Sequence, residues 1–252
     1  MGVLYYVGEI VDQDFVEAVT FFEKAAEQSN AEAQFNLGFC YAKGTGCDKD
    51  DAVAVKWYRK SAEQGCAVAQ CALGLCLLLE NGQEIDAEQA VKWFHSAAQQ
   101  GEPAAQDRLG VCYQNGVGVS QDFAAAAGWF CAAANSGFAE AQFHLGVCYA
   151  DGVGVLQNDM EAEKWFEKAA MQGVPAAQRL LGLCFLDGRG VSQDFTKALK
   201  WFRKAAQQDD AVAQINLASF YEHGYGIVQN SAEALMWYRR AAEQGNQNPM
   251  NI

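Results

Sequence analysis

The side chains that are able to do chemistry are few and are not arranged for it. The three histidines, His95, His144 and His223, lie far apart, and none belongs to a His-Glu-x-x-His zinc motif. The chain has neither a Walker phosphate loop nor the Gly-x-Ser-x-Gly turn that presents a nucleophilic serine. Its Gly-x-Gly segments lie between predicted helices and do not follow a strand, as a dinucleotide site requires. The sequence therefore predicts neither an enzyme nor a metal or cofactor site.

The nine cysteines, an odd number, fit a reducing compartment better than a disulfide framework. Five of them recur every 36 residues, at Cys40, Cys76, Cys112, Cys148 and Cys184. Repeated helices pack about 8–10 Å apart, whereas a disulfide needs Cα atoms within about 7 Å. We expect these five to be free thiols that pack as small apolar side chains. A bond between Cys66 and Cys71 stays open as an alternative.

Charge and hydropathy exclude two classes of partner. The chain carries 18 Lys and Arg against 31 Asp and Glu, a net charge of −13, without a basic block. Nucleic acids and anionic membranes attract clustered basic residues, so we expect neither as a partner. No apolar run reaches the roughly 20 residues that cross a bilayer, and Met1–Glu9 lacks the basic start of a signal peptide. We expect a cytoplasmic location, with a periplasmic or secreted one if a signal sequence precedes this chain.

A repeat organises the chain. Tryptophan recurs every 36 residues from Trp57 to Trp237, and a leucine followed by a small residue keeps the same step from Leu37 to Leu217. The pair Ala33-Gln34 recurs in the same way. We expect one solenoid over residues 1–246 and a C-terminal tail at 247–252. Its units are a partial one at 1–30 and full ones at 31–66, 67–102, 103–138, 139–174, 175–210 and 211–246.

Each unit is predicted to be a helix-turn-helix. In unit 139–174, Asn158 is a predicted N-cap with Glu161 three residues later, and glycines at 152 and 173 end the two helices. One pair of helices cannot bury both faces, so the pairs stack. The tryptophan and the aromatic residue after it are expected to fill the space between repeats. The predicted fold is all-α: a right-handed α/α superhelical solenoid of helix-turn-helix repeats.

The repeat resembles the Sel-one-like repeat (SLR) family, a relative of the tetratricopeptide repeat. The shared pattern, which residues 139–174 follow almost throughout, is Ala-x-Ala-Gln-x-x-Leu-Gly-x-x-Tyr-x-x-Gly-x-Gly-Val-x-x-Asp, then Ala-x-x-Trp-aromatic-x-Lys-Ala-Ala-x-Gln-Gly. The resemblance covers nearly the whole chain. Because members of this family act as adaptors, it implies protein binding without indicating the partner.

Two features depart from the pattern. Unit 67–102 has Glu80 in place of the loop glycine and three leucines from Leu77 to Leu79, so we expect a distorted loop at Asn81–Ile85. The chain also begins inside a first helix and stops after a second helix, without the polar end units that solenoids need. Either it is part of a longer protein or its ends pair with another copy.

The analogy with tetratricopeptide arrays places the first helices on the concave face, and we expect three columns of residues to bind a partner there. The first column, two residues before the repeated leucine, reads Phe35, Cys71, Asp107, Phe143, Arg179 and Ile215. The second, two residues after it, reads Phe39, Leu75, Val111, Val147, Leu183 and Ser219. The third, five residues after it, reads Ala42, Leu78, Gln114, Ala150, Leu186 and Glu222.

These inner columns are largely apolar, which is typical of an interface. We expect a groove that accepts a helix or an extended peptide, with Asp107 and Arg179 orienting it. The alternative is that stacking buries part of the columns.

The leading hypothesis is therefore a protein-interaction scaffold or adaptor that binds a partner protein or peptide on its concave face. One alternative is a structural solenoid that associates with itself through its uncapped ends. Another is a regulatory module of a larger enzyme or signalling complex.

Overall fold

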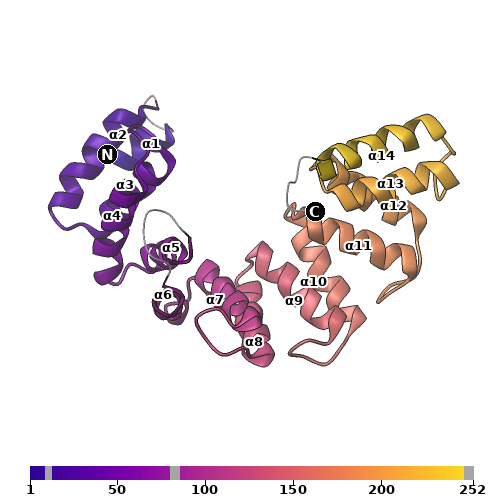
Figure 1. Ribbon diagram of the computed structural model, residues 1–252, viewed down its shortest axis with the longest axis horizontal. Coiled ribbons are helices and arrows are strands. Elements are labelled where there is room, and N and C mark those ends of the chain that lie inside the picture. The colour runs from indigo at the N-terminus through magenta and orange to yellow at the C-terminus, as the bar shows by residue number, and fades with distance from the viewer. Residues whose placement is uncertain (9–12, 80–85, 247–252) are drawn as a thin grey trace. The chain divides into compact units, whose positions relative to one another are not determined.

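The computed structural model describes residues 1–8, 13–79 and 86–246. Fourteen α-helices and no strand are formed by these residues, and the helices follow one another in pairs (Figure 1). The all-α fold of repeated helix pairs predicted from the sequence is confirmed. Glu80, the loop Asn81–Ile85 and the tail Gln247–Ile252, on which two of the sequence predictions fall, lie outside the described residues.

Odd-numbered helices are the first helices of the repeats. They are α1 (Gly2–Val7), α3 (Ala31–Lys43), α5 (Ala67–Leu78), α7 (Pro103–Asn115), α9 (Ala139–Asp151), α11 (Pro175–Asp187) and α13 (Ala211–His223). Even-numbered helices are the second helices. They are α2 (Phe15–Glu27), α4 (Asp51–Glu63), α6 (Ala87–Gln99), α8 (Phe123–Asn135), α10 (Asp159–Met171), α12 (Phe195–Gln207) and α14 (Ser231–Asn246).

The chain divides into two compact units, Met1–Trp129 and Phe130–Ile252. Within the units, the first helices α3, α5, α11 and α13 each pack against the second helix of their own repeat and against that of the repeat before it. The repeated leucine, such as Leu73 in the first unit and Leu181 in the second, has no exposed surface. The leucine column therefore packs entirely inside each unit.

Helix boundaries follow the predicted capping residues. The Asn158 side chain accepts hydrogen bonds from the Met160 and Glu161 amides at 3.1 and 3.2 Å, which confirms the N-cap of α10. First helices end at a left-handed glycine, as at Gly152 with φ 68°, except for α5, which ends at Leu79 with φ −111°. The second helix α10 ends one residue before the predicted glycine. Gln172 is its C-cap, and Gly173 follows with a φ of 97°.

The closest approach within a repeat is between the glycine after the leucine and an aromatic ring. A Cβ atom placed on Gly182 would lie 2.7 Å from Cε1 of Phe202, and one on Gly74 would lie 2.6 Å from Cε1 of Phe94. No side chain fits at that distance without moving the ring. The small-residue column of the sequence therefore lets the second helix press its ring against the backbone of the first.

The aromatic column fills the core only in part as predicted. The ring after the tryptophan is buried in the full repeats up to residue 210, with Phe94, Phe130 and Phe202 at 0% exposure, whereas Tyr238 in the last repeat is half-buried. Most of the tryptophans are half-buried, and only Trp237 falls in the buried class. A basic side chain three residues later lies over the ring of four of the tryptophans, as Lys168 does with its Nζ 3.8 Å from the Trp165 ring centroid.

A chain of buried glutamines joins successive repeats. Gln178 of α11 donates to the Ala170 carbonyl at the end of α10 at 3.1 Å, and its own carbonyl accepts from Nε2 of Gln208, after α12, at 2.8 Å. The same pair of bonds recurs with Gln34, Gln70, Gln142 and Gln214. The Ala-Gln column therefore satisfies helix-end carbonyls where the repeats meet.

We predict that Gln178→Ala lowers the free energy of unfolding by about 2 kcal/mol, because it removes both hydrogen bonds of a buried side chain. Gln193→Ala is the control: its exposed side chain also donates to a backbone carbonyl, that of Leu186, at 2.7 Å. Its effect should stay within about 0.5 kcal/mol. Urea unfolding followed by circular dichroism measures both, and equal losses would contradict a special role for the buried glutamines.

Candidate functional site

The second inner column is half-buried in both units. Phe39, Leu75 and Val111 in the first unit, and Val147 and Leu183 in the second, each keep part of their surface accessible. They differ in this from the leucines two residues before them, which are at most 1% exposed. Stacking therefore leaves large apolar side chains along one face of the first helices.

The third column is also accessible. Leu78, Gln114, Ala150 and Leu186 are half-buried, as is Ala42, and Glu222 is exposed. Glu222 is engaged within the chain, because the Tyr238 hydroxyl donates to its Oε2 at 2.8 Å.

The first column is divided. Phe35, Phe143 and Arg179 are half-buried and Ile215 is 48% exposed, but Cys71 and Asp107 are buried. Asp107 has no exposed surface at all, so it is not placed to orient a partner. The physical reason is that this column leans toward the next repeat, where short side chains are covered and long ones reach out.

Arg179 is held by the chain itself. Its Nε lies 3.2 Å from Oδ2 of Asp210, and the two side chains are 23% and 14% exposed. The other carboxylate oxygen of Asp210 accepts from the Ala213 amide at 2.8 Å and so caps α13. The arginine that the sequence suggested for orienting a ligand thus ties α11 to the start of α13.

A pocket of about 320 Å³ opens on the inner columns of the second unit, and we call it the acidic pocket. Both apolar and charged residues line it. The apolar lining consists of the half-buried Val147, Ala150, Leu180 and Leu183 and the buried Ala162, Phe166 and Cys184. The charged residues are Asp151, Asp159, Asp187 and Arg189.

The first unit has a smaller pocket of about 210 Å³, which we call the aromatic pocket. It is lined by Val3, Tyr6, Phe22, Phe35, Asn36 and Phe39. Val3, Phe22 and Phe39 precede Val147, Phe166 and Leu183 by four repeats, so the two pockets occupy the same place in the repeat. Tyr6, whose ring centroid lies 6.4 Å from that of Phe39, stands where the acidic pocket has the small Ala150.

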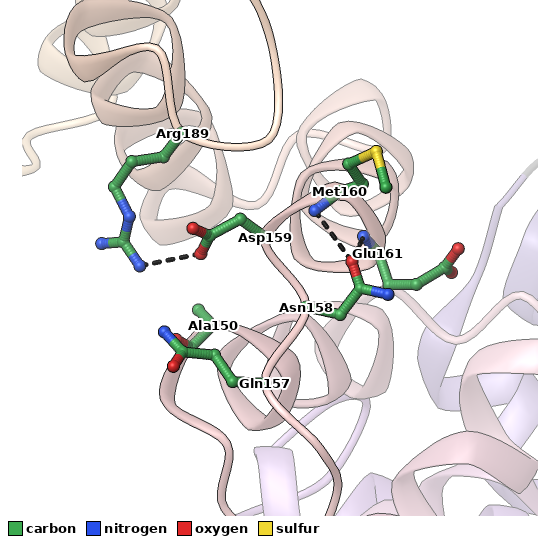
Figure 2. A network of polar contacts seen from close by, with 7 residues as sticks. All are labelled: Ala150, Gln157, Asn158, Asp159, Met160, Glu161 and Arg189. Atoms are coloured by element: carbon green, nitrogen blue, oxygen red, sulfur yellow. Dashed lines mark hydrogen bonds and ion pairs between the residues drawn. The ribbon is translucent and has the colours of Figure 1, made fainter.

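An inter-repeat ion pair borders the acidic pocket. Figure 2 shows Arg189, in the loop after α11, reaching Asp159 at the start of α10, with Nη2 2.9 Å from Oδ1. The hydrogen bond to Asp159 raises the pKa of Arg189. Next to Asp159, Asn158 caps the same helix. The guanidinium is therefore already occupied by one carboxylate.

The one thiol of this pocket is not reactive. Burial raises the pKa of Cys184 to about 11, with the carboxylates of Glu163, Asp159 and Asp187 adding to the effect. A thiol with that pKa is protonated at neutral pH and is a poor nucleophile. Within the described residues, no group of three or more His, Cys, Asp and Glu side chains is arranged to hold a metal ion. The arrangement of the pocket therefore suits binding. None of the described helices is long and apolar enough to span a bilayer.

Sequence reasoning missed the charged residues of this pocket. Asp151 and Asp187 share a column that elsewhere holds Lys43, Leu79, Asn115 and His223. The change of residue type in that column was a visible signal. Nothing in the sequence showed, however, that the ends of two first helices and the start of a second helix line one hollow.

The Sel1 repeat family matches residues 1–30, 31–66, 67–102, 103–138, 139–174, 175–210 and 211–246. Among curated proteins, none matches the chain. Proteins built from Sel1 repeats are generally protein-interaction scaffolds and are typically non-catalytic.

Solved structures agree with the family match. The chain is similar to c5321, a protective antigen present in uropathogenic Escherichia coli strains, with 37% identity and a TM-score of 0.84 over 97% of this chain and 52% of that one. It thus spans about half the length of the antigen. A Sel1 repeat protein from Oxalobacter formigenes is similar at 30% identity and a TM-score of 0.84, over 95% and 94% of the two chains. The immunity protein Pa5087 from Pseudomonas aeruginosa, at 20% identity and a TM-score of 0.56 over 82% of each chain, shares the fold.

All nine cysteines are free, including Cys66 and Cys71. Burial raises the pKa of both Cys148 and Cys184 from 9.0 to about 11, so at pH 8 their thiolate fractions fall about 100-fold. We predict that iodoacetamide alkylates these two thiols at least about 100-fold more slowly in the folded chain than in urea, where nine thiols should react. Mass spectrometry of tryptic peptides measures the rates. A disulfide-linked peptide, or equal rates in both states, would contradict this prediction.

Proposed function

Since this chain belongs to the Sel1 repeat family, we propose that it is an adaptor that binds a partner protein through the inner columns of its first helices. The observation that carries the proposal is the half-buried second column. Large apolar side chains such as Leu75 and Leu183 remain accessible although each packs against the core of its unit. An apolar surface of this kind is typical of binding faces.

The pockets support the same proposal. Each unit has a hollow on its inner columns, bounded by two first helices and the second helix between them. Hollows that hold side chains of a partner are where hot spots of binding energy concentrate. The net charge of −13 favours a partner whose contacting surface is neutral or basic. The nine free thiols support a reducing compartment, and we propose the cytoplasm as the place of binding.

The proposal predicts that Leu75→Ala with Leu183→Ala, one change in each unit, lowers partner capture at least about tenfold, because hot-spot truncations cost about 2 kcal/mol or more. Quantitative affinity capture with mass spectrometry measures this against the unchanged chain. The control is Val68→Ala with Met171→Ala, two apolar residues that are 41% and 75% exposed and lie outside the inner columns. Unchanged capture by the Leu75/Leu183 variant, with thermal melts showing that it is folded, would refute the proposal.

A second candidate function, self-association, is favoured by the last helix. Leu235 and Met236 of α14 are 50% and 49% exposed, so two neighbouring large apolar side chains face solvent. Covering them with a second copy would remove this apolar area from water.

If α14 mediates self-association, the mass from light scattering should rise with protein concentration in the unchanged chain. Leu235→Lys with Met236→Lys should then give a constant monomer mass. Leu156→Lys, at a residue 91% exposed in the loop after α9, is the control and should behave like the unchanged chain. A monomer at every concentration would rule this candidate out.

A further inference from the structure

The acidic pocket has the composition of a site for a long side chain with an apolar stem and a charged end. Its walls are apolar where Val147, Leu180 and Leu183 line it, and Phe166 closes it from the second helix. A volume of about 320 Å³ lies at the lower end of the range for ligand pockets, about 300–1,000 Å³. It is thus large enough for one side chain of a partner and too small for a folded element.

Two exposed carboxylates stand at the ends of the helices that bound this pocket. Asp151 is the last residue of α9 and Asp187 is the last residue of α11. The last turn of a helix carries partial negative charge on its free carbonyls, so a carboxylate there is electrostatically unfavourable. Among the described residues, neither forms an ion pair. A cation bound beside them would offset their negative charge and relieve the unfavourable interaction with the helix ends.

The pocket's own cation does not neutralise them. Arg189 is the only basic residue in the lining, and its guanidinium is paired with Asp159 at 2.9 Å. Asp151 and Asp187 are therefore left as excess negative charge on the lining. An acidic peptide or a free C-terminal carboxylate would be repelled here.

Repeat packing does not require this charge. Four repeats earlier, at the aromatic pocket, Val7 stands in the column of Asp151 and Lys43 in the column of Asp187. The Phe22 ring nevertheless occupies the place of Phe166, and the repeat folds in the same way. The two carboxylates are therefore specific to this pocket and are not required for the repeat to fold.

We propose that the acidic pocket receives a basic side chain, arginine or lysine, from the partner protein. The aliphatic stem lies on Val147, Leu180 and Leu183, and the cation lies toward Asp151 and Asp187. Charge-assisted hydrogen bonds to carboxylates are about twice as strong as neutral ones, and arginine makes them in pairs. The inference rests on the proposed adaptor function and specifies which chemistry the partner presents to the second unit.

The test uses the full chain with ¹³C-labelled valine and leucine methyl groups. The probes are N-acetyl-arginine methylamide, N-acetyl-lysine methylamide with a free ε-amine, and N-acetyl-citrulline methylamide, which has nearly the shape of the arginine probe but no charge. The methyl signals of Val147, Leu180 and Leu183 are followed by NMR to 50 mM probe. We expect saturable shifts with a basic probe, at least about tenfold weaker binding of the citrulline probe, and weakening of the basic probe in 0.5 M NaCl.

The matching variant is Asp151→Asn with Asp187→Asn, which removes charges that are unfavourable to their helices and should leave the chain folded. This variant should weaken the binding of the basic probe about tenfold. Glu27→Gln with Glu63→Gln is the control, because these exposed glutamates are likewise the last residues of helices, α2 and α4. The control removes the same total charge and should not change binding.

Three results overturn the inference: no saturable shift by 50 mM of either basic probe, equal binding of the citrulline probe, or unchanged binding by the Asp151/Asp187 variant. These results are separable from a failure of the adaptor function. If partner capture depends on Leu75 and Leu183 while the basic probes do not bind, the adaptor function stands and the assignment of a basic side chain is wrong. If the probes bind while capture ignores those leucines, the adaptor function is wrong.

Discussion

The rest of the structure depends on how closely the two helices of a repeat approach. In most repeats the glycine after the repeated leucine leaves no room for a Cβ atom, since one on Gly182 would lie 2.7 Å from the Phe202 ring, whereas the last repeat has Ala218 there. This contact fixes which face of the first helix is used for packing. Residues advance by about 100° per position in an α-helix, so the second column lies about 200° from the leucine and about 100° from the glycine. It therefore lies outside the face that packs on the second helix, and its side chains stay half-buried.

Polar interactions then connect one repeat to the next. Gln178 links α10, α11 and the end of α12 through two hydrogen bonds, and Arg179 links α11 to Asp210 before α13. Because buried polar groups must be paired, these contacts specify the register of the stack. The side chains of Gln178 and Arg179 are therefore committed to holding repeats together.

One framework thus produces two different pockets. The acidic and aromatic pockets share an aromatic ring from the second helix and apolar residues from two first helices. They differ in residues that the framework leaves free, with Tyr6 in place of Ala150 and Lys43 in place of Asp187. Because packing does not restrict these positions, they are where binding preferences can change without altering the fold. On the proposed adaptor function, specificity for a partner comes from the ends of the first helices as much as from their middle.

The sequence by itself determined the helices, their order and the repeat, because capping residues, glycines and apolar spacing are local signals repeated with a period of 36 residues. It also predicted three inner columns, because they vary where the packing columns do not, and left open how far stacking would bury them. The tertiary structure alone decided how much of each side chain is covered. It buried Asp107, engaged Arg179, and left five of the six tryptophans half-buried. It also brought Asp151, Asp159, Asp187 and Arg189 around one pocket. Those outcomes depend on distances between residues of different repeats, which a pattern within one repeat does not contain.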